Sequence, residues 1–127
     1  MEMTGRKAVV CEDNWALSGI LQHLLIREGL ETVSAGDGEE GLQCVRAHQP
    51  SILVLDLSMP RRDGFSVLIE LKRQPAAGLK VLVASHFEEP GQMDLVRQLG
   101  ADAVLSKPFA PAEFASAVQG LLGEVAA

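Results

Sequence analysis

This sequence of 127 residues contains no apolar run near the ~20 residues that a membrane-spanning helix needs. Its first residues, MEMTGRK, lack the apolar core of a secretory signal. Positive charge is also scarce: 11 Lys and Arg stand against 17 Asp and Glu, and the net charge of −6 would repel the phosphates of nucleic acid or of an anionic membrane. We therefore expect a cytoplasmic protein that binds neither membrane nor nucleic acid directly. Any phosphate chemistry here needs a cation.

Cysteine is rare, with only Cys11 and Cys44 in the chain. The first falls in a predicted strand and the second in a predicted helix. In an intracellular protein, such residues behave as small buried hydrophobes more often than as a disulfide or a metal pair. We assign them no function.

Short apolar runs rich in Val, Ile and Leu alternate with amphipathic stretches, the pattern of buried parallel strands between helices. The predicted strands are 7–11, 31–35, 52–55, 81–84 and 103–105. The predicted helices are 14–28, a weaker one with Leu42 and Val45, 65–73, 90–99, and a last one with Phe114 and Val118. In the first helix, one buried face is predicted from the spacing of Leu17, Ile20, Leu21, Leu24 and Leu25.

Five uninterrupted strand–helix units predict an α/β fold: a parallel sheet with right-handed crossovers and helices on both faces, a three-layer sandwich. Five units are too few for a barrel, so the sheet is open. In the strand order 2-1-3-4-5 the order reverses between strands one and three, and ligands of open sheets bind at the carboxyl edge near such a reversal. We expect one domain, residues 1–127, with a core of about 6–123.

Polar residues follow the predicted strands at this carboxyl edge. Glu12 and Asp13 follow strand one, Asp56 follows strand three, Ser85 follows strand four and Lys107 follows strand five. Two carboxylates about 4 Å apart repel by about 4 kcal/mol at an effective dielectric of about 20, and a hard divalent cation, Mg²⁺ or Mn²⁺, relieves this repulsion. The set predicts phosphoryl transfer to Asp56 as nucleophile, with the lysine and the serine binding the phosphoryl oxygens.

The stretches VVCEDN, AGDGEEGL, ILVLDLSMPRRDGF, VLVAS and GADAVLSKPF resemble those of response-regulator receiver domains of two-component signalling, such as chemotaxis-type regulators. The likeness covers almost the whole chain and implies a flavodoxin-like doubly wound (βα)5 fold. It also implies roles for the edge residues: Asp56 as phosphoryl acceptor, Glu12 and Asp13 as the Mg²⁺-holding pair, the main-chain carbonyl of Ser58 as a further metal ligand, Ser85 and Lys107 as the phosphate-sensing pair, and a cis Lys107–Pro108 bond.

The resemblance implies partners as well. A sensor histidine kinase or histidine phosphotransfer protein would supply the phosphoryl group, and a separate partner or a fused output domain would read a changed surface on the last two helices and strand five. Pairing of two copies through that surface stays open, as do the kinase, the stimulus and the phosphate lifetime. The domain itself is expected not to be an enzyme with an external substrate.

Three departures from the family pattern bear on mechanism. Val104 stands where the family commonly has a switching aromatic, and the residue after Ser85, usually small, is His86. Phe87 follows, with no polar atom to orient an attacking water. We therefore expect a shielded phosphoryl group that hydrolyses slowly, and we expect motion in the segment 86–99.

Other residues have plainer interpretations. Asp63 and Gly64 are expected to form a turn and a helix start. Arg61 and Arg62 are expected to be solvated, and the three histidines are expected to share no metal. Trp15 is expected to be partly exposed beside the site.

Three competing functions remain at this stage. A haloacid-dehalogenase-type phosphatase would have a second acid two residues after its nucleophile, whereas Asp56 is followed by Leu57 and Ser58. A flavodoxin-like cofactor binder would need phosphate-cradling amides that the segment after strand one lacks. A degenerate receiver acting as a phosphate-independent scaffold is disfavoured by the intact acceptor, acid and lysine.

Overall fold

The computed structural model describes residues 5–123 and contains five strands and five helices in strict alternation within that range. They are β1 (Lys7–Cys11), α1 (Trp15–Arg27), β2 (Glu31–Ala35), α2 (Gly38–His48), β3 (Ile52–Leu55), α3 (Gly64–Arg73), β4 (Lys80–Ser85), α4 (Gln92–Gln98), β5 (Ala103–Ser106) and α5 (Pro111–Leu122). All strand pairs are parallel, in the order β2-β1-β3-β4-β5. The predicted fold and strand order are confirmed.

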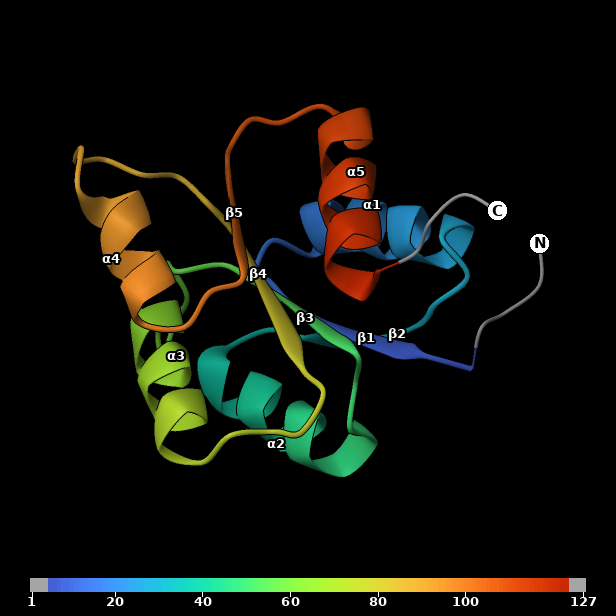
Figure 1. Ribbon diagram of the computed structural model, residues 1–127, viewed down its shortest axis with the longest axis horizontal. Coiled ribbons are helices and arrows are strands. Elements are labelled where there is room, and N and C mark those ends of the chain that lie inside the picture. The colour runs from blue at the N-terminus through green and yellow to red at the C-terminus, as the bar shows by residue number, and fades with distance from the viewer. Residues whose placement is uncertain (1–4, 124–127) are drawn as a thin grey trace.

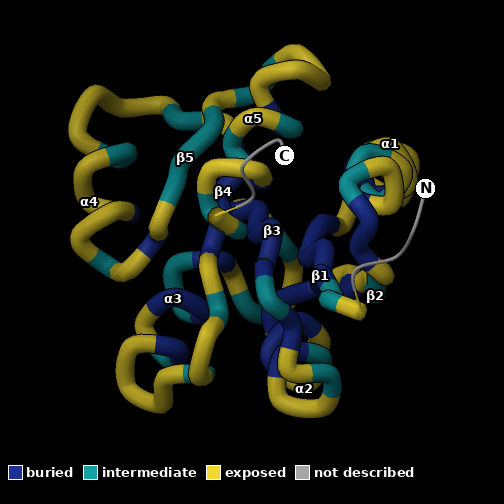
Figure 2. Tube along the Cα trace, turned by 45° about the vertical axis from the view of Figure 1, so that its right-hand side comes forward, coloured by how far each residue is buried: buried dark blue, intermediate teal, exposed yellow. Residues whose placement is uncertain are grey.

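The sheet separates two layers of helices (Figure 1). Helices α1 and α5 cover one face, and α2, α3 and α4 cover the other. Figure 2 shows that burial is concentrated in the strands between these layers. Because side chains alternate along a strand, each central strand contributes to both apolar clusters. On β3, Leu53 and Leu55 face the α2–α3 side, and Ile52 and Val54 face the α1–α5 side.

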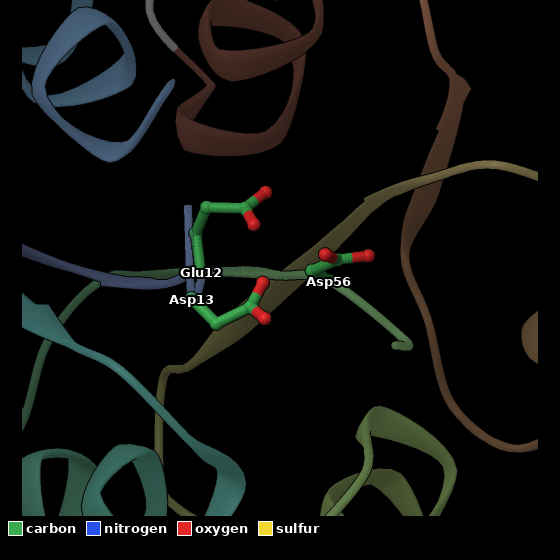
Figure 3. A group of neighbouring side chains, drawn as sticks. All are labelled: Glu12, Asp13 and Asp56. Carbon is green, nitrogen blue, oxygen red and sulfur yellow. The ribbon is translucent and has the colours of Figure 1, made fainter. Parts of the chain in front are cut away.

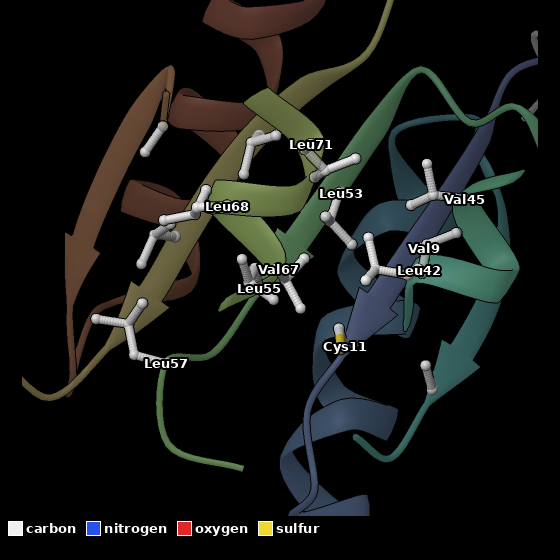
Figure 4. Close-up of a cluster of buried hydrophobic side chains, with 14 of the residues drawn as sticks. Val9, Cys11, Leu42, Val45, Leu53, Leu55, Leu57, Val67, Leu68 and Leu71 are labelled. Carbon is white, nitrogen blue, oxygen red and sulfur yellow. The ribbon is translucent and has the colours of Figure 1, made fainter. Parts of the chain in front are cut away.

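The larger apolar cluster lies between the sheet and helices α2, α3 and α4 (Figure 4). Its helical members include Leu42 and Val45 of α2 and Leu68 of α3. Burial of a side chain of this size stabilises the fold by about 1.5–3 kcal/mol. This packing holds β3 rigidly beneath the polar residues at its carboxyl end.

Three helices begin with a side-chain cap at the same edge of the sheet. Asn14 accepts from the backbone N–H of Leu17 at the start of α1, and Asp37 accepts from Glu40 at the start of α2. Asp63 caps α3, where the sequence predicted a turn and helix start. Such caps satisfy backbone donors at a helix N-terminus and fix the direction in which each loop enters its helix.

The predicted buried face of α1 is wrong in part. Leu21 and Leu25 are buried, but Ile20 is 56% exposed, and the buried stripe includes Ser18 instead. The physical reason is that α1 contacts the sheet and α5 along a narrow stripe of its surface. Ile20 lies next to this stripe but outside it, so its side chain faces outward. Helix α4 is also shorter than predicted, because residues 90 and 91 form a turn before Gln92.

No helix within the described range has both the length and the apolar character required to cross a bilayer.

Candidate functional site

Three carboxylates meet where the strand order reverses, at the carboxyl ends of β1 and β3 (Figure 3). Glu12 and Asp13 follow β1, and Asp56 follows β3. One oxygen of each lies within 4.8 Å of the others, and among residues 5–123 no other group of three His, Cys, Asp or Glu comes this close. Asp13 is exposed, whereas Glu12 and Asp56 are buried.

Asp56 is buried, with only 7% of the residue exposed, and its carboxylate accepts hydrogen bonds from three residues. Its backbone N–H donates to the carbonyl of Cys11 at 3.0 Å, which ties it to β1. Its Oδ1 accepts from Ser85 Oγ at 2.8 Å and from the backbone N–H of Ser58 at 3.4 Å. Its Oδ2 lies 3.4 Å from Lys107 Nζ. These hydrogen bonds fix the orientation of the Asp56 carboxylate.

Lys107 makes a closer contact with Glu12 than with Asp56. Its Nζ lies 2.6 Å from Glu12 Oε1, and Glu12 Oε2 accepts from the backbone N–H of Asn14 at 3.2 Å. Burial raises the pKa of the Glu12 carboxyl, and the hydrogen bond from Lys107 opposes this without cancelling it. The backbone N–H of Lys107 donates to the backbone carbonyl of Ser85 at 2.9 Å, and the Lys107–Pro108 peptide bond is cis.

The sequence did not predict the pairing of Lys107 with Glu12. The two residues are 95 positions apart and follow strands that are not neighbours, so neither spacing nor strand pairing indicates the contact. The contact forms because the lysine side chain is long enough to extend across the edge of the sheet to Glu12.

The loop after Asp56 is shaped by a close approach of Gly64. Its backbone N–H donates to the carbonyl of Leu57 at 2.9 Å, and a Cβ atom at this position would collide with the backbone carbonyl of Asp56. Only glycine leaves room for this contact. Ser58 lies on the exposed part of the same loop, beside the acceptor.

His86 and Phe87 occupy different surroundings. His86 is exposed and lines a cavity of about 290 Å³ next to Ser58 and Ser85. Phe87 is half-buried, packs at the rim of the larger apolar cluster with Val104, and lines a separate groove beside α4 and β5.

Two expectations for exposed residues need correction. Trp15 is 85% exposed rather than partly covered, because the first turn of α1 stands clear of the sheet. Arg61 and Arg62 are not merely solvated: Arg61 Nε lies 3.2 Å from Asp37 Oδ2, and Arg62 NH1 lies 3.0 Å from Glu39 Oε2. The partners are the N-cap residue of α2 and a residue of its first turn, and the sequence pattern does not reveal that this end of α2 lies next to the loop.

Relatives of the chain include regulators of transcription. The alkaline phosphatase synthesis transcriptional regulatory protein PhoP of Bacillus subtilis is 33% identical over 124 residues, covering 96% of this chain and 51% of PhoP. The transcriptional regulatory protein PdtaR of Mycobacterium tuberculosis is 33% identical over 115 residues, covering 90% of this chain and 55% of PdtaR. The chain thus spans about half the length of these curated relatives.

Solved receiver domains have the same fold. The receiver domain of the Francisella response regulator 1452 superimposes with a TM-score of 0.86 at 26% identity, covering 94% of this chain and 98% of the other. The signal receiver domain of a signal transduction histidine kinase from Syntrophus aciditrophicus gives 0.85 at 26% identity, covering 94% and 91%.

A family model described as the response regulator receiver domain matches residues 8–119. This match includes strands β2 to β5, all of β1 except Lys7, and the acid cluster at the edge of the sheet. The chain belongs to the response regulator receiver domain family.

Proposed function

We propose that this receiver domain accepts a phosphoryl group on Asp56 from the phosphohistidine of a sensor histidine kinase or a histidine phosphotransfer protein. The observation that carries the proposal is the grouping of two further carboxylates, a hydroxyl and an ammonium around Asp56. In the transfer, a carboxylate oxygen of Asp56 forms a bond to phosphorus while the bond from phosphorus to the donor imidazole nitrogen breaks.

The donor set fits Mg²⁺ or Mn²⁺, because it offers only oxygen ligands within 4.8 Å of one another. Glu12, Asp13, Asp56 and the main-chain carbonyl of Ser58 are the residues that would hold the ion. When bound, it neutralises charge between the acceptor and the incoming phosphoryl group.

Ser85 and Lys107 are the proposed donors to the phosphoryl oxygens. The hydroxyl of Ser85 already donates to Asp56 Oδ1, so a small rotation about its Cα–Cβ bond redirects it to a phosphoryl oxygen. Lys107 supplies a positive charge from the other side of the carboxylate. Ser85 is the last residue of β4 and Lys107 directly follows β5, so the sheet positions the backbone of both residues while their side chains can turn.

Slow loss of the phosphoryl group follows from the surroundings. Asp56 is buried, and His86 lines the cavity beside Ser58 and Ser85, where its side chain narrows access to the acceptor; Phe87, which has no polar atom to orient a water, lines a separate groove. The domain then stores a signal rather than turning over an external substrate.

The signal is proposed to leave through the surface of α4, β5 and α5. Phosphorylation adds about 1.5 to 2 negative charges. A change of this size can shift only an element whose two packing arrangements are already close in free energy. Val104 and Phe87 pack at the rim of one apolar cluster. A change in the Ser85 side chain would move the segment 86–99, which follows it directly, and Phe87 in that segment would pass the change to Val104. We expect amide exchange in this segment to change on activation, and unchanged exchange would contradict this route.

The chain is proposed to act in the cytoplasm as one domain, residues 1–127. Since its curated relatives are about twice as long and are transcriptional regulators, a fused output domain is one route for the output, and a separate partner or a homodimer is the other.

The test is intact-mass spectrometry after incubation with Mg²⁺ and acetyl phosphate, beside Asp56→Asn and an EDTA control. One added phosphoryl group, absent from both controls, is the expected result. If the folded parent takes up no label and releases no phosphate, the proposal fails in favour of a phosphate-independent scaffold. Steady phosphate release without retained label would instead favour an Asp-nucleophile phosphatase.

A further inference from the structure

The loop that follows the acceptor, residues 57–63, is here called the acceptor loop. Near its end it carries two arginines whose side chains pair with acids at the start of α2. Arg61 has a φ of 62°, in the left-handed region that costs a residue with a side chain about 1–2 kcal/mol. Its guanidinium pairs with the buried carboxylate of Asp37, which also caps α2. The ion pair thus binds Arg61, a residue in a strained backbone conformation, to the N-cap of α2.

Arg62 makes the more extensive set of contacts. Its Nε donates to Ser66 Oγ at 2.9 Å, its NH1 lies 3.0 Å from Glu39 Oε2, and its NH2 lies 3.8 Å from Glu70 Oε2. Ser66 and Glu70 belong to α3, and Glu39 belongs to α2. One planar guanidinium therefore joins the acceptor loop to both helices, a geometry that the point charge of a lysine does not reproduce.

The main chain of Arg62 forms a further link. Its carbonyl accepts from the backbone N–H of Gly38 at 3.0 Å, and a Cβ atom on Gly38 would collide with that carbonyl. The φ of Gly38 is ordinary, so the position needs glycine for space rather than for conformation. The first turn of α2 therefore rests directly on the end of the acceptor loop.

The acceptor loop is consequently fixed at both ends. At its start, the backbone N–H of Ser58 donates to Asp56 and the carbonyl of Leu57 accepts from Gly64. At its end, Arg62 holds it by side chain and main chain. Ser58 lies between these two fixed points, so its backbone has little freedom to change conformation.

We propose that Arg62 is a positioning residue for the metal site: it holds the acceptor loop in the conformation that presents the Ser58 carbonyl beside Glu12, Asp13 and Asp56. This inference rests on the proposed function, because it assigns Arg62 a part in the cation dependence of that same site. Arg62 touches neither acceptor nor phosphoryl group. It acts through the loop.

The experiment is an NMR titration of the full chain with Mg²⁺, following the backbone amides of Asp13 and Ser58 in the parent and in Arg62→Ala. Loss of a residue that orients a metal ligand weakens binding by about tenfold or more, and we expect a Kd for Mg²⁺ raised by about that factor. Arg73→Ala is the matched control: Arg73 pairs with the same Glu70, at 2.8 Å, but does not touch the acceptor loop. Its Kd should stay within about twofold of the parent.

A second readout separates positioning from catalysis. At saturating Mg²⁺ the phosphorylation rate of Arg62→Ala should return to near the parent rate, since only the affinity for the ion is changed. A Kd equal to that of Arg73→Ala, in a folded Arg62→Ala protein, overturns the inference. Should Arg62→Ala not fold, Arg62→Lys retains the charge and the stem without the three-way contact, and a parental Kd in that variant overturns the inference equally.

Failure of the proposed function is distinguishable. If the parent binds no Mg²⁺ and takes up no phosphoryl group, hydrogen exchange of Gly38 and Gly64 in EDTA still tests whether Arg62 orders the loop. Exchange of both amides faster in Arg62→Ala than in Arg73→Ala would show that Arg62 orders the loop although the metal site has failed, and equal exchange would overturn the ordering as well.

Discussion

Lys107 is bound to Glu12 more closely than to Asp56, with Nζ at 2.6 Å from the first carboxylate and 3.4 Å from the second. The lysine thus neutralises an acid that belongs to the candidate metal cluster as well as the candidate acceptor. Its side chain is nine-tenths buried, and so is that of Glu12. Positive charge from Lys107 and from a cation should therefore stabilise the same two buried carboxylates, Glu12 and Asp56.

Replacing this lysine should destabilise the fold most when no cation is present. Lys107→Met leaves two buried carboxylates without their cationic partner, and breaking such a pair costs about 3 kcal/mol or more. We expect a loss of this size in urea unfolding with EDTA and a smaller loss with Mg²⁺. Lys72→Met, at an exposed lysine on α3, should cost less than about 0.5 kcal/mol in both. Equal losses with and without Mg²⁺ would contradict the shared support.

Gly64 should tolerate no side chain. In Gly64→Ala the new methyl group meets backbone of Asp56 and Leu57, which cannot swing aside, so we expect a loss of about 1–3 kcal/mol in unfolding free energy and weaker labelling of Asp56. The matched control is Gly19→Ala in α1, where a Cβ meets nothing within 4 Å. That change should stabilise the protein by about 0.5–1 kcal/mol, because alanine favours a helix interior. Denaturation curves of equal midpoint for the two variants would refute this.

Ser85→Ala should reduce both stability and phosphorylation. The change removes the donor 2.8 Å from Asp56 Oδ1 and an acceptor for the backbone N–H of Leu57. Hydrogen bonds to charged groups contribute about 1.5–3 kcal/mol, so we expect a loss of about 2 kcal/mol in chemical denaturation. Initial rates of labelling by acetyl phosphate should fall as well. Ser116→Ala, at an exposed serine on α5, should change neither quantity.

The Cys11 thiol should be almost unreactive in the folded protein. Burial raises the pKa of the Cys11 thiol to about 12, with the charge of Asp37 adding to the effect, so almost no thiolate forms at neutral pH. Cys44 is only partly buried. In the Cys44→Ser variant, we expect native protein to react with a chromogenic disulfide reagent far more slowly than unfolded protein does. Equal rates in the two states would show that Cys11 is accessible.

The central strands β1, β3 and β4 were predictable because they are buried on both faces. A run such as 52–55 has no polar position to break it, and all four of its residues are buried by helices above and below. The meeting of Glu12, Asp13 and Asp56 then followed from one rule: parallel strands bring their carboxyl ends to one edge, and a cleft forms where their order reverses.

Contacts made by long side chains were not predictable in this way. The choice of Glu12 by Lys107, and of Asp37 and Glu39 by the two loop arginines, depends on the distance between elements that the chain does not connect directly. The exposure of Ile20 has a related cause, because periodicity gives the direction of an apolar face but not how much of it a neighbouring helix covers.

The central position of β3 has a consequence for how the molecule opens. The strand is hydrogen-bonded to β1 on one side and to β4 on the other, and two helical layers cover it. Fluctuations that release an edge strand or fray a helix end leave such a strand intact, so its amides should exchange only when the whole domain unfolds. Asp56 directly follows the strand that is expected to unfold last. A phosphoryl group on Asp56 would therefore stay in place while the proposed output surface of α4, β5 and α5 unfolds locally.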